Sequence, residues 1–265
     1  MRIGFLQFCP KFGEKEENLK KVKHLLKSIR ADLVVLPELF NTGYLFYSKD
    51  ELAKFSEEIP EGPTTEALLN LAKSQRLNLV AGLAERRGNK FFNSAILVSS
   101  KGEVKTYRKI HLFYKERFLF TPGDKPFAVF QIGSTKIGIV ICFDWIFPEA
   151  IRVLTLKGAQ IICHPANLVL PYCQKAMITR AIENRVFVIT ANRTSSERRG
   201  GQSLKFTGKS QIVDPQGQVL AKTNSRAEIV KVIDIDSALA LNKKITEYND
   251  IFKDRRVRFY QRITV

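Results

Sequence analysis

The segment Ile137-Gly138-Ile139-Val140-Ile141-Cys142-Phe143-Asp144-Trp145 decides what fold we expect. Its first five residues form an apolar run without polar alternation, which is typical of a strand buried on both faces. Pro148 follows shortly after and suits the first turn of a helix, which we expect over 148–157. The segment therefore predicts a buried strand that turns sharply into a helix, with Cys142 at the carboxyl end of the strand.

The same alternation of strand and helix recurs along the chain. Apolar residues at helical spacing also predict helices over 16–30, 64–75 (with Thr64 or Thr65 as N-cap) and 174–184. Short apolar runs predict strands over 3–8, 33–36, 79–84, 92–99, 103–108, 127–132, 136–141, 159–163, 186–191, 210–213, 219–221 and 229–235. There are more predicted strands than one short sheet holds, so we expect an α/β fold with two stacked sheets between helical layers. No linker or internal repeat divides the chain, and we expect one domain over residues 1–265.

Composition narrows the class of protein. The 265 residues are 45% apolar, enough for a sizeable core. The N-terminal segment lacks the features of a signal peptide, and no run reaches the ~18 apolar residues of a membrane span. We therefore expect a cytoplasmic protein without membrane contact. Its four cysteines show no C-x-x-C or zinc-finger spacing, so disulfides and a structural zinc site are not expected.

The net charge of +17 is the main reason to consider a nucleic-acid partner. The basic residues are spread over the chain, however, and no RNA-binding motif, helix-turn-helix signature or zinc knuckle accompanies them. A solvated basic surface is the favoured interpretation. A nucleic-acid-binding protein on an idle scaffold remains the alternative from a different functional class.

Reactive side chains follow several predicted strands. Glu38 follows 33–36, Lys109 follows 103–108 and Cys142 follows the opening strand. In α/β folds, sites gather at the carboxyl ends of strands. Taken singly, the glutamate could be a helix cap, the lysine a solvated base and the cysteine a core residue.

Together, these three side chains form a coherent catalytic set. The carboxylate can take the thiol proton and deliver it to a leaving amine, and the ammonium can stabilise an oxyanion. The backbone N–H of Phe143 is a candidate second oxyanion donor. Cys142 is therefore a candidate nucleophile on a strand-to-helix turn.

Three blocks resemble, in order, the signature blocks of the nitrilase superfamily, the carbon–nitrogen hydrolases. They are Leu36-Pro37-Glu38-Leu39-Phe40, Arg108-Lys109-Ile110-His111-Leu112 and Ile141-Cys142-Phe143-Asp144. The resemblance continues through segments such as His164-Pro165-Ala166-Asn167 and covers essentially the whole chain. It implies a four-layer αββα sandwich and a Glu38–Lys109–Cys142 triad acting through a thioester.

The resemblance has further implications for site residues and partners. Glu116 matches a second family glutamate that holds the lysine or helps proton transfer. Family members commonly dimerise through helices near the nucleophile turn, which here are 148–157 and 174–184. No metal or organic cofactor is expected. Tyr44, Phe113, Trp145 and Asn167 are candidate substrate contacts, and His111 and His164 are interpreted as structural.

The sequence after the cysteine bears on the substrate. True nitrilases usually carry Cys-Trp-Glu, whereas this chain has Cys142-Phe143-Asp144, which resembles the amidase and carbamoylase branches. We therefore expect hydrolysis of a small amide or carbamoyl compound with release of ammonia. Hydrolysis of a nitrile to a carboxylic acid and ammonia stays open.

Overall fold

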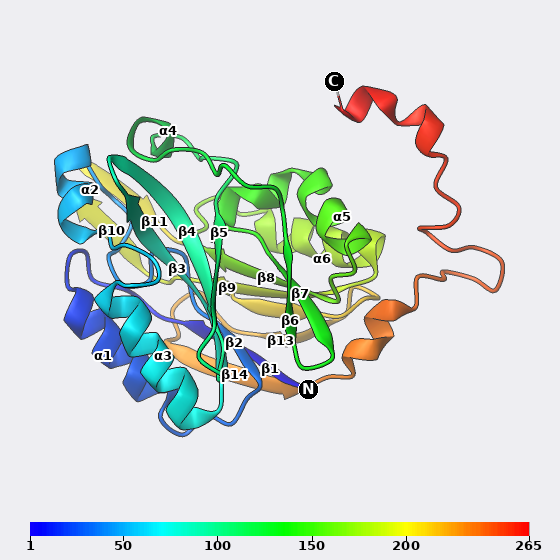
Figure 1. Cartoon of the computed structure of the whole chain (residues 1–265), viewed down its shortest axis with the longest axis horizontal. Coiled ribbons are helices and arrows are strands. Elements are labelled where there is room, and N and C mark those ends of the chain that lie inside the picture. The colour runs from blue at the N-terminus through cyan, green and yellow to red at the C-terminus, as the bar shows by residue number, and fades with distance from the viewer. Residues whose placement is uncertain (265) are drawn as a thin grey trace.

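The computed structural model describes residues 1–264 and contains two six-stranded sheets (Figure 1). The first sheet has the strand order β14-β1-β2-β3-β4-β5. Strands β1, β2 and β3 are parallel, and the other pairs are antiparallel. The bounds of its strands are β1 Arg2–Gln7, β2 Leu33–Val35, β3 Asn78–Arg87, β4 Lys90–Val98, β5 Val104–Arg108 and β14 Ile229–Asp234.

The second sheet has the order β13-β12-β9-β8-β7-β6, with a parallel centre made of β7, β8 and β9. Its strands are β6 Val129–Ile132, β7 Thr135–Ile139, β8 Ile161–Ala166, β9 Phe187–Asn192, β12 Gln211–Val213 and β13 Val219–Lys222. A separate hairpin pairs β10 Ser196–Arg199 with β11 Gln202–Lys205.

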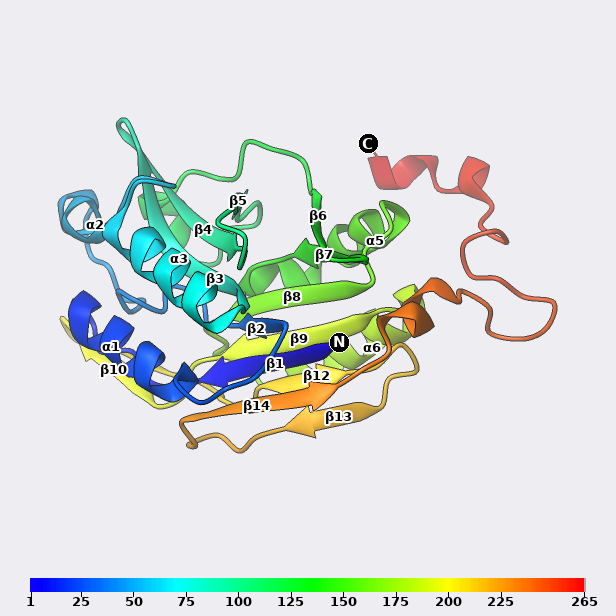
Figure 2. The same ribbon diagram turned by 60° about the horizontal axis from the view of Figure 1, so that its bottom comes forward.

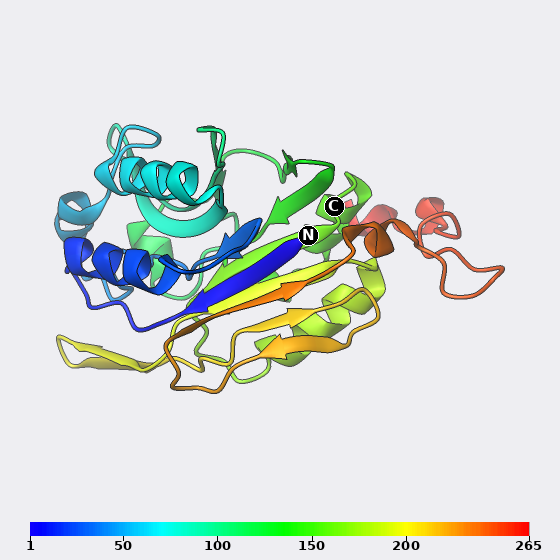
Figure 3. The same ribbon diagram turned by 90° about the horizontal axis from the view of Figure 1, so that it is seen from below.

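Helices cover the outer faces of the two sheets. Helices α1 Lys15–Leu26 and α3 Pro63–Gln75 cover the first sheet, and α5 Pro148–Leu156 and α6 Cys173–Asn184 cover the second. The two other α-helices are α2 Lys49–Phe55 and α4 Glu116–Leu119. Figures 2 and 3 show α1 and α3 on the far side of the strands from α6. This order of layers is the expected four-layer αββα sandwich. Shorter 3-10 helices are η1 Cys142–Ile146, η2 Ser237–Leu241, η3 Val257–Phe259 and η4 Gln261–Thr264.

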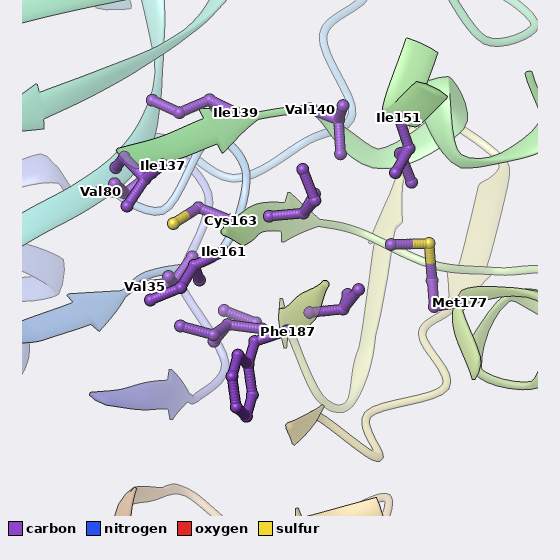
Figure 4. Packing of buried hydrophobic residues seen from close by; sticks show 14 of the residues in the cluster. Val35, Val80, Ile137, Ile139, Val140, Ile151, Ile161, Cys163, Met177 and Phe187 are labelled. Atoms are coloured by element: carbon purple, nitrogen blue, oxygen red, sulfur yellow. The ribbon is translucent and has the colours of Figure 1, made fainter. Parts of the chain in front are cut away.

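Two apolar cores hold these layers together. One lies between α1, α3 and the outer face of the first sheet, where Val22 and Leu68 pack against strand residues such as Val34. The other fills the space between the sheets and continues under α5 and α6. In Figure 4, Val35 from the first sheet lies among residues of the second sheet, and Met177 approaches from α6. The alternation of side chains along each strand explains why one strand serves two cores.

The topology brings the predicted reactive residues to common sheet edges. Because β5 is antiparallel to β4, and β4 to β3, strand β5 runs in the same direction as β2. Glu38 and Lys109 therefore leave the first sheet at the same edge. Cys142 and Asn167 likewise follow two parallel strands, β7 and β8, of the second sheet.

Several expectations about local structure were wrong. The predicted cap at Thr64 or Thr65 lies inside α3, whose N-cap is Gly62, with Pro63 in the first turn. The carboxylate of Glu57, outside the helix, accepts the N–H of Thr64 at 2.8 Å, so the helix needs no threonine cap. Strand β7 ends at Ile139, before the expected 141, and β8 continues to Ala166.

Helices α2 and α4 and the β10–β11 hairpin were not predicted. These elements are short, and the hairpin strands are rich in charged residues. Neither the helical nor the strand spacing of apolar residues therefore indicates them. Within residues 1–264, no helix is long and apolar enough to cross a membrane.

Candidate active site

Cys142 sits on a strained turn at the start of η1. Its φ of 41° lies in the left-handed region, which residues other than glycine rarely adopt. Two side chains hold the turn: the Asp144 carboxylate accepts the N–H of Ile141 at 2.8 Å, and His164 Nε2 donates to the carbonyl of Cys142 at 3.0 Å. The turn presents a cysteine between strand and helix, as the sequence predicted.

Asp144 connects this turn to the segment that carries the lysine. It is fully buried, and its Oδ2 also accepts the hydroxyl of Tyr107 at 2.7 Å. Its Oδ1 accepts the backbone N–H of His111 at 3.2 Å and lies 2.7 Å from His111 Nδ1. The His111 ring stacks on Phe147, with ring centroids 3.7 Å apart. One carboxylate thus bonds four donors from two parts of the site.

Glu38, Lys109 and Glu116 form a buried cluster. Lys109 Nζ donates to Glu38 Oε1 at 2.7 Å and to Glu116 Oε1 at 2.9 Å. Lys109 and Glu38 side chains have no exposed surface, and Glu116 is 5% exposed. The structure therefore brings together three of the four residues predicted to be catalytic through direct hydrogen bonds.

Neighbouring groups orient the two carboxylates. Asn93 Nδ2 donates to Glu38 Oε1 at 2.7 Å, and the N–H of Phe113 donates to Glu116 Oε2 at 2.9 Å. The hydroxyl of Tyr44 donates to Glu116 Oε1 at 2.9 Å. By contrast, Glu38 Oε2 is buried and accepts no hydrogen bond from residues 1–264. This oxygen is the available proton acceptor of the cluster.

Burial and charge shift the protonation of these groups. Burial raises the pKa of the Cys142 thiol well above its ordinary value, and the carboxylate of Glu38 adds to the effect. Burial alone would lower the pKa of Lys109, but the carboxylates of Glu116 and Glu38 outweigh it and raise that pKa. Burial also raises the pKa of Glu116. The resting site therefore combines a neutral thiol with a permanent cation.

A small cavity of about 10 Å³ lies beside the thiol. This volume is close to the minimum that one water molecule needs. Its walls are mainly apolar and include three predicted substrate contacts, Phe113, Trp145 and Asn167. Asn167 also donates to the backbone carbonyl of Glu38 at 2.9 Å, while its own Oδ1 is buried without a partner among residues 1–264.

The remaining histidines and cysteines are placed differently. Burial lowers the pKa of His164 to about 4, so this residue is neutral at neutral pH and donates through Nε2 to the carbonyl of Cys142. Cys163 and Cys173 are fully buried, and burial raises the pKa of both thiols. Over the described part of the chain, no group of three His, Cys, Asp or Glu side chains is arranged to hold a metal ion.

The roles of several residues of the site were not predicted from the sequence. The sequence predicts Asn93 only as part of a strand, although an amide side chain beside Phe92 in a largely apolar run is a usable signal. Asp144 was noted within its block but given no role. Glu197, which accepts the N–H groups of Tyr44 and Leu45, was given no role either.

Comparison with known proteins agrees with this architecture. The family model described as carbon-nitrogen hydrolase matches residues 2–243. The chain is 47% identical over 265 residues to a nitrilase from Pyrococcus abyssi, covering 99% of this chain and 100% of that protein. It is 34% identical over 262 residues to a 2-oxoglutaramate amidase from Bacillus subtilis, covering 95% and 98%.

A solved structure is similar over the same extent. It is a mutant amidase from Nesterenkonia sp. AN1, described as showing the Michael addition of acrylamide at its active site cysteine. The TM-score is 0.82 at 25% identity, covering 99% of each chain. The chain belongs to the carbon–nitrogen hydrolase family, as the three sequence blocks indicated. It is a hydrolase of carbon–nitrogen bonds.

Proposed function

We propose that this protein hydrolyses small primary amides or carbamoyl compounds, with Cys142 as nucleophile and Glu38 as general base and acid. The observation that carries this proposal is the free, buried Oε2 of Glu38. Its other oxygen is occupied by Lys109 and Asn93, so the carboxylate is oriented with one lone-pair face available.

Charge balance favours transfer of the thiol proton to Glu38 over its loss to water. The buried cluster holds one ammonium and two carboxylates beside a neutral thiol. Loss of the proton to solvent would add a second uncompensated negative charge in a site with little water. Transfer to Glu38 keeps the net charge constant, because one carboxylate becomes neutral as the thiolate forms.

The acylation step then follows. The Cys142 sulfur attacks the amide carbon, and the carbonyl oxygen gains negative charge. Lys109 stabilises this oxyanion, together with the N–H of Phe143, which lies too early in η1 to bond a carbonyl within that helix. Glu38 gives its proton to the departing nitrogen, ammonia leaves and a thioester remains.

Hydrolysis of the thioester restores the enzyme. A water molecule loses a proton to Glu38 and attacks the thioester carbon. The carbon–sulfur bond breaks, the acid is released, and the proton on Glu38 returns to the thiolate. Glu116 takes no proton in this cycle. Its role is to hold Lys109 in position through their 2.9 Å hydrogen bond.

The contacts of a small substrate would be Phe113, Trp145 and Asn167, because these three side chains line the surface beside the Cys142 thiol. A nitrile remains the second candidate substrate, because the relative from Pyrococcus abyssi is a nitrilase. Measurement of ammonia release from primary amides, carbamoyl compounds and nitriles separates these classes. Cys142→Ala should abolish ammonia release from every substrate while the protein stays folded. An Ala variant with the full rate would contradict the assignment of Cys142 as the nucleophile.

We also infer that the protein is a homodimer, with one domain in each chain. Apolar side chains remain exposed on η1, α5 and α6 and just before α6, namely Ile146, Val153, Leu156, Tyr172 and Ile182. Exposed apolar side chains on neighbouring elements are typical of a subunit interface. In sedimentation velocity, Val153→Glu should shift the protein toward monomer, whereas Leu220→Glu on β13 should not. A cytoplasmic location stays a prediction.

A further inference from the structure

The β10–β11 hairpin reaches the active site through the segment that follows Glu38. The Glu197 carboxylate, on β10, accepts the N–H of Tyr44 at 3.1 Å and the N–H of Leu45 at 2.6 Å. On the same strand, Arg199 donates to the carbonyl of Leu45 at 2.7 Å. Glu197 and Arg199 thus hold both the N–H and the carbonyl of Leu45, the residue next to Tyr44.

Glu197 is itself held by a buried cation. Arg193 is 1% exposed, and its Nη1 donates to Glu197 Oε2 at 2.6 Å. Its guanidinium also lies over the Phe206 ring at 4.1 Å, and that ring meets Tyr44 edge to face at 6.0 Å. Arg193 therefore supports Tyr44 twice, through its backbone and through its ring.

The hydroxyl of Tyr44 ends this chain of contacts on Glu116. It donates at 2.9 Å to the same oxygen that accepts Lys109 Nζ. Burial of the hydroxyl and the nearby carboxylate of Glu116 raise the pKa of Tyr44 well above its ordinary value, so the phenol stays protonated and donates. The charged form of Glu116 is the one that benefits.

We propose that Tyr44, braced by Glu197 and Arg193, is a positioning residue that keeps Glu116 ionised and so keeps Lys109 in place for the reaction. The inference rests on the proposed roles of Glu116 and Lys109. It assigns the β10–β11 hairpin, which lies outside the two sheets, to the active site. It also gives Tyr44 a task other than contact with substrate.

The pH dependence carries the test, because a merely structural tyrosine would not move it. The titratable groups near Glu116 are Lys109, Glu38, Tyr44 and the neutral thiol of Cys142. Lys109 and the N–H of Phe113 stabilise the carboxylate, whereas Glu38 repels it. Tyr44→Phe removes only the hydroxyl donor, so the pKa of Glu116 should rise further. Activity at the acid end should then be lost at a higher pH than in the wild type.

The experiment compares pH profiles of kcat/KM for ammonia release. For Tyr44→Phe we expect about a tenfold loss and an acid limb moved up by about one pH unit, the size expected for one hydrogen bond to a charged group. Glu197→Gln should move the limb in the same direction. Tyr47→Phe, on the same segment but 39% exposed, is the matched control and should leave the profile unchanged.

A Tyr44→Phe profile that superimposes on the wild type after scaling would overturn the proposal, as would an equal shift in Tyr47→Phe. Inactivation by iodoacetamide across the same pH range gives a second readout that needs no substrate. If the wild type releases no ammonia from any amide, the proposed function fails. The alkylation profiles then still decide whether Tyr44 controls the site.

Discussion

Asp144→Asn tests whether the nucleophile turn depends on a single buried carboxylate. The two backbone donors at this carboxylate, the N–H groups of Ile141 and His111, approach different oxygens. Asparagine offers only one acceptor oxygen, so whichever way it is oriented, one backbone N–H faces its NH2 group. Tyr107 and His111 Nδ1 can turn or change tautomer, but a backbone N–H cannot.

The expected loss of stability follows from the hydrogen bonds that Asp144→Asn removes. One lost hydrogen bond to a charged group and one unsatisfied buried donor together destabilise the fold by about 3 kcal/mol. For a protein of this size, that corresponds to a fall in Tm of about 6–12 °C. The turn would also be free to relax from its left-handed φ, and displacement of a reacting group by about 1 Å lowers kcat by about 100-fold.

The assay is thermal unfolding followed by circular dichroism, with ammonia release measured at a temperature where both proteins are folded. Asp234→Asn is the matched control, because Asp234 is 76% exposed and its ion pair with Arg2 spans 3.6 Å. It should leave Tm and kcat nearly unchanged. An Asp144→Asn variant with wild-type Tm and wild-type kcat would show that the nucleophile turn does not depend on the Asp144 carboxylate.

Three further predictions concern charge and burial. Because the pKa of His164 is lowered to about 4, the free energy of unfolding should fall by about 3 kcal/mol as pH drops from about 6.5 to 4; denaturant titrations of His164→Gln should show a flatter dependence, and an identical slope would contradict this. Lys109→Met leaves the two carboxylates that it bridges without a counter-charge, so denaturant titration at pH 8 should show a loss of about 3–5 kcal/mol; an unchanged free energy would argue against the cluster. Iodoacetamide should inactivate the folded enzyme by labelling Cys142 while Cys163 and Cys173 stay unmodified, and peptide mapping that finds label on either would show that they are accessible.

Much of the site was predictable because its residues follow strands. Glu38, Lys109 and Cys142 stand at the ends of apolar runs, where the topology of an α/β fold gathers side chains. The layers were also predictable, since they follow from apolar periodicity and from the family resemblance. The chemistry of the three residues could therefore be stated before their distances were known.

The supports of the site were not predictable in this way. Tyr44 and Glu197 are 153 residues apart in the sequence, and neither lies in a pattern that indicates the other. Asn93 turns toward Glu38 only because β4 pairs with β3 in a particular register. Such contacts depend on where loops and strands meet in space, which apolar periodicity does not report.

The central claim is that substrate acylates Cys142. The direct measurement is rapid acid quench of the enzyme during turnover of a primary amide, followed by peptide mass spectrometry. We expect an acyl group on the peptide that contains Cys142 in the wild type, and neither the adduct nor ammonia with Cys142→Ala. An acyl group on another residue, or undiminished ammonia release by Cys142→Ala, would contradict it.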